Sequence, residues 1–273
     1  MSFFSGKLAF ITGGSSGIGL ETAVLLASLG CRLVLLARDQ AKLDEACRYI
    51  EEQSAQTGRQ IHAVSTVSMD VADNDEVLEK IKAAVELYGT PDILINSAGI
   101  GTGNYFENIS YESFDAVMKI NVYGTRNTIS AVLRYMKKKG GGHIVNLSSF
   151  ACLIGMFGYS LYSTSKYALV GFSECLRSEL KRYNIHVSVV CPPEVKTPFI
   201  EEEAKTLPPE ARAVKNLAGL LEPGYVAKSI VHGIKKKRFL IVPGLLTKWL
   251  YFNHRISNGH LTRIISDWIV RHV

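Results

Sequence analysis

The fold of this chain is decided by one stretch near its beginning, Leu8-Ala-Phe-Ile-Thr-Gly13-Gly-Ser-Ser-Gly17-Ile-Gly19. Its first five residues are apolar or β-favouring and predict a buried strand, and a helical pattern opens at Gly17. A glycine-rich turn between a strand and a helix is typical of a nucleotide-binding βαβ unit. In such a turn Gly13 permits the tight bend, Gly17 lets backbone approach a pyrophosphate, and Gly19 allows close helix–strand packing.

Apolar, β-rich runs alternate with longer helical patterns through most of the chain. We expect strands at 8–12, 32–37, 62–69, 92–96, 143–148, 186–191 and 239–242, and helices near 17–29, 40–56, 74–88, 110–138, 163–183 and 223–236. This alternation predicts an α/β fold, a doubly wound (Rossmann) parallel sheet of seven strands with helices on both faces. Its ligand is expected at the carboxyl ends of the strands.

Length and composition fit one large domain. The 273 residues are 47% hydrophobic, which is enough for a single core of the size common to doubly wound domains. We expect a nucleotide-binding domain over residues 1–242, with a substrate lid near 200–221. Residues 243–273 are expected to form a C-terminal helical extension.

Charge and cysteine content argue against several classes of protein. The net charge of +6 is modest, and no nucleic-acid-binding motif accompanies the short basic runs at 137–139 and 235–238. The five cysteines are scattered and never spaced Cys-x-x-Cys, which argues against a disulfide framework and against a metal site. Residues 1–7 are too few and too polar for a signal peptide, so we expect a cytoplasmic protein.

Tyr162 and Lys166 form a Tyr-x-x-x-Lys pair, thirteen residues after Ser149. Four residues are about one helical turn, so the phenol and the ammonium project from the same helix face. A cation beside a phenol favours the phenolate and is expected to lower the pKa of Tyr162 toward the range of an acid–base catalyst. Together with the glycine-rich turn, this pair indicates hydride transfer. Tyr159 has no lysine four residues on and is interpreted as a pocket wall.

The end of the second expected strand bears on the choice of dinucleotide. A site for NAD has a carboxylate about 20 residues after the glycine-rich turn, where it holds the ribose 2′-hydroxyl. Here the strand is followed by Arg38 and Asp39. Arg38 can bind a 2′-phosphate through two hydrogen bonds, and Asp39 is expected to cap the next helix instead. We therefore predict NADP(H), with the hydroxyls of Ser15 and Ser16 as further phosphate contacts.

Two more segments follow expected strands on the cofactor side. Asp70 is placed either to hydrogen-bond adenine or to serve as a turn or cap residue. Asn96-Ser97-Ala98-Gly99 ends the next strand with small residues, which would let backbone lie close to the adenine ribose.

These elements together resemble the short-chain dehydrogenase/reductase family. The resemblance covers about residues 7–242 and rests on Gly13, Gly17 and Gly19, Asn96-Ser97-Ala98-Gly99, Asn121, Ser149, Tyr162 and Lys166. It implies that Tyr162 protonates a carbonyl oxygen and that Lys166 lowers the Tyr162 pKa and binds the nicotinamide ribose. It further implies that Ser149 polarises the carbonyl and that Asn121 holds a water of a proton relay.

The resemblance also implies a set of cofactor contacts and an assembly. The contacts are Gly13, Ser15, Ser16, Gly17, Ile18, Gly19, Arg38, Asp70, Asn96, Ala98, Gly99, Tyr162, Lys166, Pro192, Val195 and Thr197. A homodimer or tetramer is expected through the helices that follow the fourth and fifth strands.

One segment departs from the family pattern. Where the family has Pro-Gly after the sixth strand, this chain has Pro192-Pro193 and then Glu194, which stiffens the loop, while Thr197 can still contact the carboxamide of nicotinamide. This run, the Ala37-Arg38 strand end and Phe157-Gly158-Tyr159 resemble the 3-ketodihydrosphingosine reductases within the family.

The residues near Ser149 predict an apolar pocket. Segments 150–157 and 198–200 are apolar and contribute no Arg or Lys for a small anion, and 201–203 is interpreted as a solvated helix face. We predict NADPH-dependent reduction of a ketone on an apolar lipid such as 3-ketodihydrosphingosine. A steroid or retinoid dehydrogenase and a 3-oxoacyl reductase are alternatives. A non-catalytic NADP-binding sensor or scaffold is another, against which Ser149, Tyr162 and Lys166 argue.

The chain becomes aromatic, aliphatic and basic after Val242. An apolar helical stripe follows from the spacing of Leu261, Ile264, Ile265, Trp268 and Ile269. The stretch before it is too interrupted to span a bilayer. The tail is expected either to contact the cytoplasmic face of a membrane or to pack on the body or a dimer partner.

Overall fold

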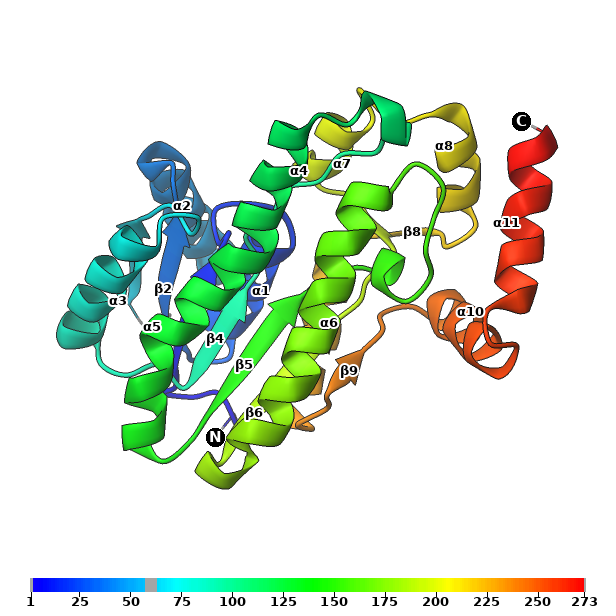
Figure 1. Ribbon diagram of the computed structural model, residues 1–273. Coiled ribbons are helices and arrows are strands. Elements are labelled where there is room, and N and C mark those ends of the chain that lie inside the picture. The colour runs from blue at the N-terminus through cyan, green and yellow to red at the C-terminus, as the bar shows by residue number, and fades with distance from the viewer. Residues whose placement is uncertain (1, 57–62, 273) are drawn as a thin grey trace.

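A seven-stranded parallel sheet forms the centre of the computed structural model, which describes residues 2–56 and 63–272 (Figure 1). Its strands are β1 (Leu8–Thr12), β2 (Arg32–Ala37), β3 (Val64–Ser68), β4 (Ile93–Asn96), β5 (Gly142–Leu147), β6 (Ile185–Val190) and β9 (Leu240–Ile241). They lie in the order β3-β2-β1-β4-β5-β6-β9, and neighbouring strands are parallel. The predicted doubly wound α/β fold is confirmed.

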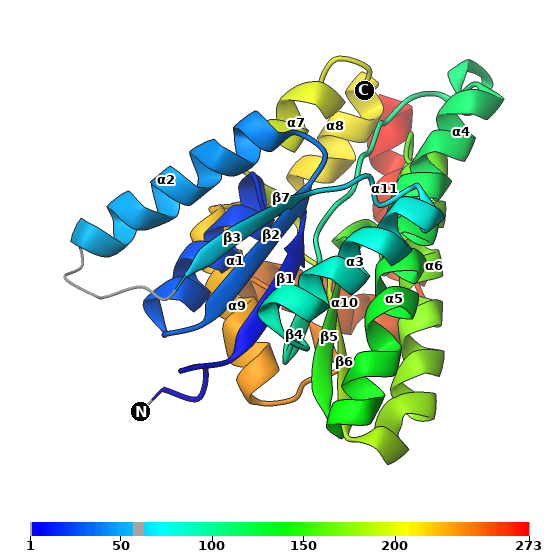
Figure 2. The same cartoon turned by 90° about the vertical axis from the view of Figure 1, so that its left-hand side faces the viewer.

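Helices cover both faces of the sheet (Figure 2). One face carries α1 (Gly17–Ser28), α2 (Gln40–Gln56) and α9 (Pro223–Lys235), and the other carries α3 (Asn74–Tyr88), α5 (Gly124–Lys139) and α6 (Ser160–Leu180). Side chains of β1 alternate between two cores: Ala9 and Ile11 pack with the first set of helices, and Leu8 and Phe10 with the second. A strand buried on both faces must be apolar throughout, which explains its continuous apolar run.

The strand order creates a switch point between β1 and β4. Thr12 at the end of β1 lies opposite Leu36 of β2 on one side and Asn96 of β4 on the other. The chain leaves these two neighbouring strands in opposite directions, so a crevice opens at their carboxyl ends, where ligands of open α/β sheets bind. The glycine-rich turn after β1 and residues 97–99 after β4 both lie there.

Several bounds differ from those predicted. The strand predicted at 62–69 is observed over Val64–Ser68, and His62 lies outside the described residues. The single helix predicted over 110–138 is two helices, α4 (Tyr111–Met118) and α5, joined by a π-helical turn at Lys119–Tyr123. Apolar periodicity does not reveal such a turn. Short 3-10 turns occupy Phe106–Asn108, Phe150–Cys152 and Lys181–Tyr183.

Four short elements that the sequence pattern did not predict lie between β6 and α9. β7 (Glu194–Val195) pairs in parallel with β8 (Leu220–Leu221), and between them lie α7 (Pro198–Glu203) and α8 (Pro209–Asn216). Both helices begin with a proline, whose fixed φ suits the first helical position. Figure 2 shows α7 and α8 beyond the carboxyl ends of the central strands, where the substrate lid was predicted.

The predicted helical tail is confirmed. It consists of α10 (Leu245–Ile256) and α11 (His260–His272), and α11 contacts α8 (Figure 1). The tail therefore packs on the body, yet Trp249 and Trp268 remain 59% and 62% exposed. Within the described part of the chain, no helix is long and apolar enough to cross a bilayer.

Candidate active site

The glycine-rich turn is packed so closely that it excludes side chains. Gly13 has a φ of +64°, and a Cβ there would lie 2.7 Å from the backbone nitrogen of Ala98. A Cβ on Gly19 would lie 2.3 Å from the carbonyl oxygen of Gly13. Thr12 fastens the turn to the segment after β4, because its Oγ1 accepts hydrogen bonds from the N–H groups of Ser97 and Ala98, each at 3.2 Å. Bare backbone therefore faces the crevice, as pyrophosphate binding requires.

A cavity of about 220 Å³ joins this turn to the predicted catalytic residues. The predicted site residues that line it are Gly13, Ser16, Gly17, Ile18, Ala98, Gly99, Ser149, Tyr162, Lys166, Pro192, Val195 and Thr197. Away from the turn, much of its wall is apolar, formed among others by Met156 and Phe199, and the Tyr162 and Phe199 rings lie 5.8 Å apart. Segments from both halves of the chain thus share one cavity.

Ser149, Tyr162 and Lys166 converge from two elements. Ser149 follows β5 and caps the 3-10 turn after it, its Oγ accepting a hydrogen bond from the N–H of Ala151 at 3.2 Å. Tyr162 and Lys166 lie one turn apart near the start of α6, and both are buried. Lys166 Nζ lies 5.5 Å from the centre of the Tyr162 ring and donates to the carbonyl oxygen of Leu147 at 3.1 Å.

Burial dominates the titration of these two groups. It raises the pKa of Tyr162 above its usual 10, the carboxylate of Glu203 adds to the rise, and a hydrogen bond with Ser149 opposes it. The direction is opposite to the lowering predicted from Lys166, because the phenolate would lose its hydration in this buried site and the Glu203 carboxylate disfavours it further. Burial also lowers the pKa of Lys166 from 10.5 to about 8. Tyr162 is therefore a neutral phenol at neutral pH, the form that can donate a proton.

Asn96 and Asn121 are buried outside the cavity lining. The Asn96 amide donates to Asn146 Oδ1 at 2.8 Å and accepts from Thr128 Oγ1 at 2.7 Å, which ties β4 to β5 and α5. Asn121 lies in the π-helical turn, and its side chain bonds the backbone of Ile100. The Asn96 amide thus fixes the end of β4 and the Asn121 amide fixes the segment after it, and neither residue lines the cavity.

Four other predicted cofactor residues also lie outside the cavity lining: Ser15, Gly19, Arg38 and Asp70. Arg38 is exposed just after β2, and no described residue forms an ion pair with it. Asp39 Oδ1 accepts from the N–H of Lys42 at 3.1 Å, as a cap of α2 should. Asp70 Oδ1 accepts from the N–H of Ala72 at 2.9 Å, which agrees with its interpretation as a turn residue.

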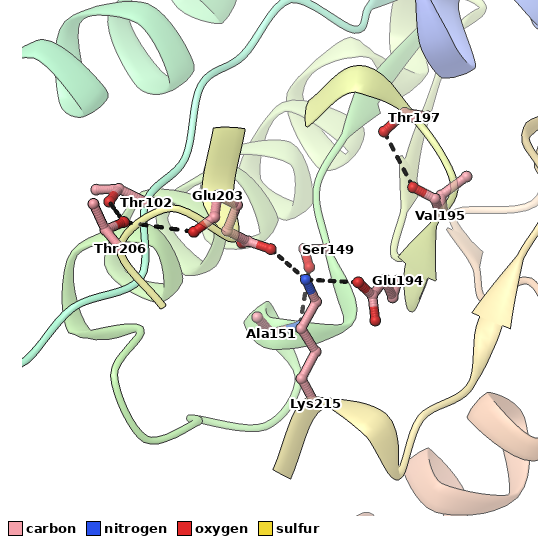
Figure 3. A network of polar contacts seen from close by, with 9 residues as sticks. All are labelled: Thr102, Ser149, Ala151, Glu194, Val195, Thr197, Glu203, Thr206 and Lys215. Carbon is pink, nitrogen blue, oxygen red and sulfur yellow. Dashed lines mark hydrogen bonds and ion pairs between the residues drawn. The ribbon is translucent and has the colours of Figure 1, made fainter. Parts of the chain in front are cut away.

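The cavity also holds a charged cluster that the sequence pattern did not reveal (Figure 3). Lys215 Nζ lies 2.9 Å from the carboxylate of Glu194 and also pairs with that of Glu203. Glu203 is only 3% exposed, so its interpretation as part of a solvated helix face is wrong. Segments 150–157 and 198–200 contribute no Arg or Lys, as expected, but Lys215 of α8 lines the cavity as well. No local spacing could have shown this pairing, since Glu203 and Lys215 lie on different helices.

Known proteins resemble this chain in sequence and in fold. Residues 7–208 match the family model of the short chain dehydrogenases. The 3-dehydrosphinganine reductase of Danio rerio is 40% identical over 228 residues, 83% of this chain and 68% of the relative. The 3-ketodihydrosphingosine reductase of Mus musculus is 39% identical over 227 residues, with the same two coverages, 83% and 68%. A solved short chain dehydrogenase/reductase from Burkholderia phymatum in complex with NAD has a TM-score of 0.77 at 28% identity, covering 89% of this chain and 90% of that chain.

Fold, cavity and relatives agree on one class of protein, a dinucleotide-dependent oxidoreductase. The chain belongs to the short-chain dehydrogenase/reductase family. The prediction of an enzyme is therefore confirmed, and the relatives bear the names of the reductases that the Pro192-Pro193 run resembles.

Proposed function

We propose that this enzyme reduces the ketone of a long-chain lipid with NADPH, as in the conversion of 3-ketodihydrosphingosine to dihydrosphingosine. The observation that carries the proposal is the cavity in which Ser149, Tyr162 and Lys166 lie between the glycine-rich turn and an apolar wall. Such a wall suits a hydrocarbon chain better than a sugar. The names of the Danio rerio and Mus musculus relatives support the choice of ketone.

The residues present fit a dinucleotide. Gly13 leaves no room for a Cβ against Ala98, and Gly17 and Ile18 line the same cavity at the start of α1. The N-terminus of a helix with free N–H groups favours phosphate. When bound, NADPH would supply the hydride, and Thr197, which also lines the cavity, would contact its carboxamide.

Tyr162 is the proposed general acid. Its raised pKa keeps the proton on the phenol until the carbonyl oxygen accepts it. Ser149, at the end of β5, would donate to the same oxygen and polarise the carbonyl. Lys166 would hold the ribose of the cofactor, and Asn121, whose side chain bonds the Ile100 backbone and Ser165, would position the segment beside Lys166.

Arg38 supports NADPH over NADH. Its side chain is exposed. It lies beside the glycine-rich turn, since the N–H of Gly13 donates to the carbonyl oxygen of Leu36, two residues before Arg38, at 2.8 Å. The nearby acid, Asp39, is engaged as the cap of α2. A free guanidinium at this position suits a 2′-phosphate.

Residues 200–221 would act as the lid of a domain over 1–242. Ile200, Glu203, Lys215 and Ala218 line the cavity from this segment. Two described side-chain contacts join the lid to the loop after β4, one between Thr102 and Thr206 at 2.8 Å and one from the Tyr105 hydroxyl to the Glu210 carboxylate at 3.0 Å. A lid held to the neighbouring loop by few hydrogen bonds can open to admit substrate.

The tail would contact the surface of a membrane. Phe252 and Ile264 are 63% and 66% exposed on α10 and α11, like the two tryptophans. Four Arg or Lys residues accompany them against one acid: Lys248, Arg255, Arg263 and Arg271 against Asp267. Exposed aromatic and aliphatic side chains with basic neighbours suit an interface with anionic lipids. Because α11 contacts α8, a lipid could pass from there to the lid.

The proposal is tested by following NADPH oxidation with 3-ketodihydrosphingosine in detergent micelles, with NADH in parallel. We expect turnover with NADPH and a much slower reaction with NADH. Tyr162→Phe should lower kcat by about 10²–10⁴-fold and still bind NADPH, since only the proton donor is lost. Reduction of a steroid ketone or a 3-oxoacyl thioester, but not of this substrate, would move the assignment to those alternatives.

A further inference from the structure

The charged cluster of Glu194, Glu203 and Lys215 lies in a cavity whose neighbouring wall is apolar. Glu203 is 3% exposed, and the side chains of Glu194 and Lys215 are 14% and 13% exposed. Lys215 lies between the two carboxylates and pairs with both (Figure 3). Two carboxylates share one ammonium, so the cluster carries one negative charge in excess. Buried charge without a full partner is costly and often marks a binding site.

The field of this cluster reaches the reacting end of the cavity. After burial, the carboxylate of Glu203 is the largest contribution to the raised pKa of Tyr162. Glu203 lines the same cavity as Tyr162, so its carboxylate can act on a group bound next to the reduced carbonyl. Lys166 also lines the cavity, but its Nζ donates to the carbonyl oxygen of Leu147.

A second polar atom beside the cluster has no partner. Tyr159 is 2% exposed and lines the same cavity, and its hydroxyl forms no hydrogen bond with any described residue. Its ring centre lies 6.1 Å from that of Tyr162. Burial raises the pKa of Tyr159, and the Glu203 carboxylate raises it further both by its charge and as an acceptor beside the hydroxyl, so Tyr159 stays a neutral phenol. A buried hydroxyl without a partner costs stability unless a ligand completes its bonding.

We propose that Glu203 and Tyr159 bind the ammonium group of a 2-amino ketone and make the enzyme selective for amino ketones over plain ketones. The inference rests on the proposed function, because it concerns the substrate of the same site. In 3-ketodihydrosphingosine the amino group is on the carbon next to the ketone, so it lies beside Tyr162 when the ketone does. The substrate ammonium is a second cation beside Lys215, so the occupied cluster holds two positive and two negative charges. The Tyr159 oxygen accepts a hydrogen bond from one N–H group of this ammonium.

The test compares two long-chain substrates that differ only in the amine. They are 3-ketodihydrosphingosine and 1-hydroxyoctadecan-3-one, both reduced with NADPH in the same micelles. Glu203→Gln should lower kcat/KM for the amino ketone relative to that for the plain ketone by about 10–100-fold, mostly through KM. Any effect of Glu203 on the Tyr162 pKa acts on both substrates alike, so the ratio isolates recognition of the amine.

Matched variants separate recognition from folding. Glu202→Gln alters a neighbouring carboxylate that pairs with Lys205 at the surface, so it should leave the ratio unchanged. Lys215 keeps Glu194 as a partner in Glu203→Gln, which favours a folded variant. Tyr159→Phe removes a hydroxyl without a protein partner, so it should not destabilise the fold, and it should lower the ratio about 3–10-fold.

Failure of the inference differs from failure of the proposed function. If wild type reduces both ketones and neither Glu203→Gln nor Tyr159→Phe changes the ratio, amine recognition is overturned and the reductase stands. An equal loss on both substrates in both variants also overturns it, because the residues are then structural. If wild type binds NADPH but reduces neither ketone, the proposed function falls and the inference with it.

Discussion

Asn121 bonds both polar groups of the Ile100 backbone. Its Oδ1 accepts from the Ile100 N–H at 2.9 Å, and its Nδ2 donates to the Ile100 carbonyl oxygen at 2.8 Å. The same Nδ2 reaches Ser165 Oγ at 3.0 Å, on the residue before Lys166. One fully buried side chain thus joins the π-helical turn, the segment after β4 and helix α6. π-helical turns are frequent at functional sites, and here the turn positions Asn121 for these hydrogen bonds.

Asn121→Ala should lower the free energy of unfolding by about 2–4 kcal/mol, because it removes the bonds to Ser165 and to the half-buried N–H and carbonyl groups of Ile100. Asn121→Asp keeps the acceptor for the Ile100 N–H but loses the donor, and should destabilise too. Urea denaturation measures the loss, and hydrogen exchange at residues 98–101 locates it. An Asn121→Ala protein with unchanged stability and unchanged exchange would show that the Asn121 hydrogen bonds do not stabilise the fold.

Arg38→Ala should lower kcat/KM for NADPH by about 10–100-fold and leave that for NADH nearly unchanged, because only NADPH carries the 2′-phosphate. Arg48→Ala is the matched control, since Arg48 is an exposed arginine on nearby α2. Steady-state kinetics with both cofactors gives the ratio. An equal loss with both would place Arg38 outside the 2′-phosphate site.

The lowered pKa of Lys166 predicts a pH-dependent stability. The folded protein releases this proton near pH 8 and the unfolded chain near pH 10.5, so the unfolded state holds more protons between them. Below pH 8 the folded protein bears the full free-energy cost of the buried Lys166 ammonium. This cost decreases as the pH rises from about 8 to 10.5, so the folded state becomes more stable. Lys166→Met removes the titration. Between pH 7 and 9.5 the stability of wild type should rise by about 2 kcal/mol relative to this variant. A constant difference in denaturation experiments contradicts the prediction.

The tail should bind anionic membranes through its exposed aromatic side chains. Replacing Trp249 and Trp268 together by Ala should lower binding to vesicles of phosphatidylcholine and phosphatidylserine by about tenfold. Tyr111→Ala on α4 removes another exposed aromatic residue and should have no effect. Co-sedimentation measures the binding. Equal binding of the double variant and wild type would assign the exposed faces of α10 and α11 to another contact.

Local sequence patterns predicted the bounds of those helices that local interactions determine. The bounds of α2 and α3 agree with the predicted 40–56 and 74–88, because caps and apolar periodicity act within one helix. Asp73 shows this directly, since its side chain accepts from two N–H groups in the first turn of α3. The π-helical turn at Lys119–Tyr123 was missed, since its surroundings rather than its pattern select it.

The residues of the candidate site likewise fall into those that local spacing predicted and those that only the structure revealed. Spacing placed Ser149, Tyr162 and Lys166 together, and the structure finds all three lining one cavity. Spacing could not show that Glu203 is buried, because its partner Lys215 comes from another helix. Three acids in a row are the pattern of a solvated face, and only tertiary contacts around the cavity, among them the ion pair with Lys215 of α8, remove Glu203 from water.

The sequence by itself determined the parallel sheet, the glycine-rich turn and the order of the chemical groups, because strand and helix periods and short spacings act along the chain. The tertiary structure alone decided which groups lost water. Burial set the pKa directions of Tyr162 and Lys166, and folding brought Glu203 and Tyr159 into the cavity that they line. Hydration depends on segments far apart in sequence, and no local pattern records it.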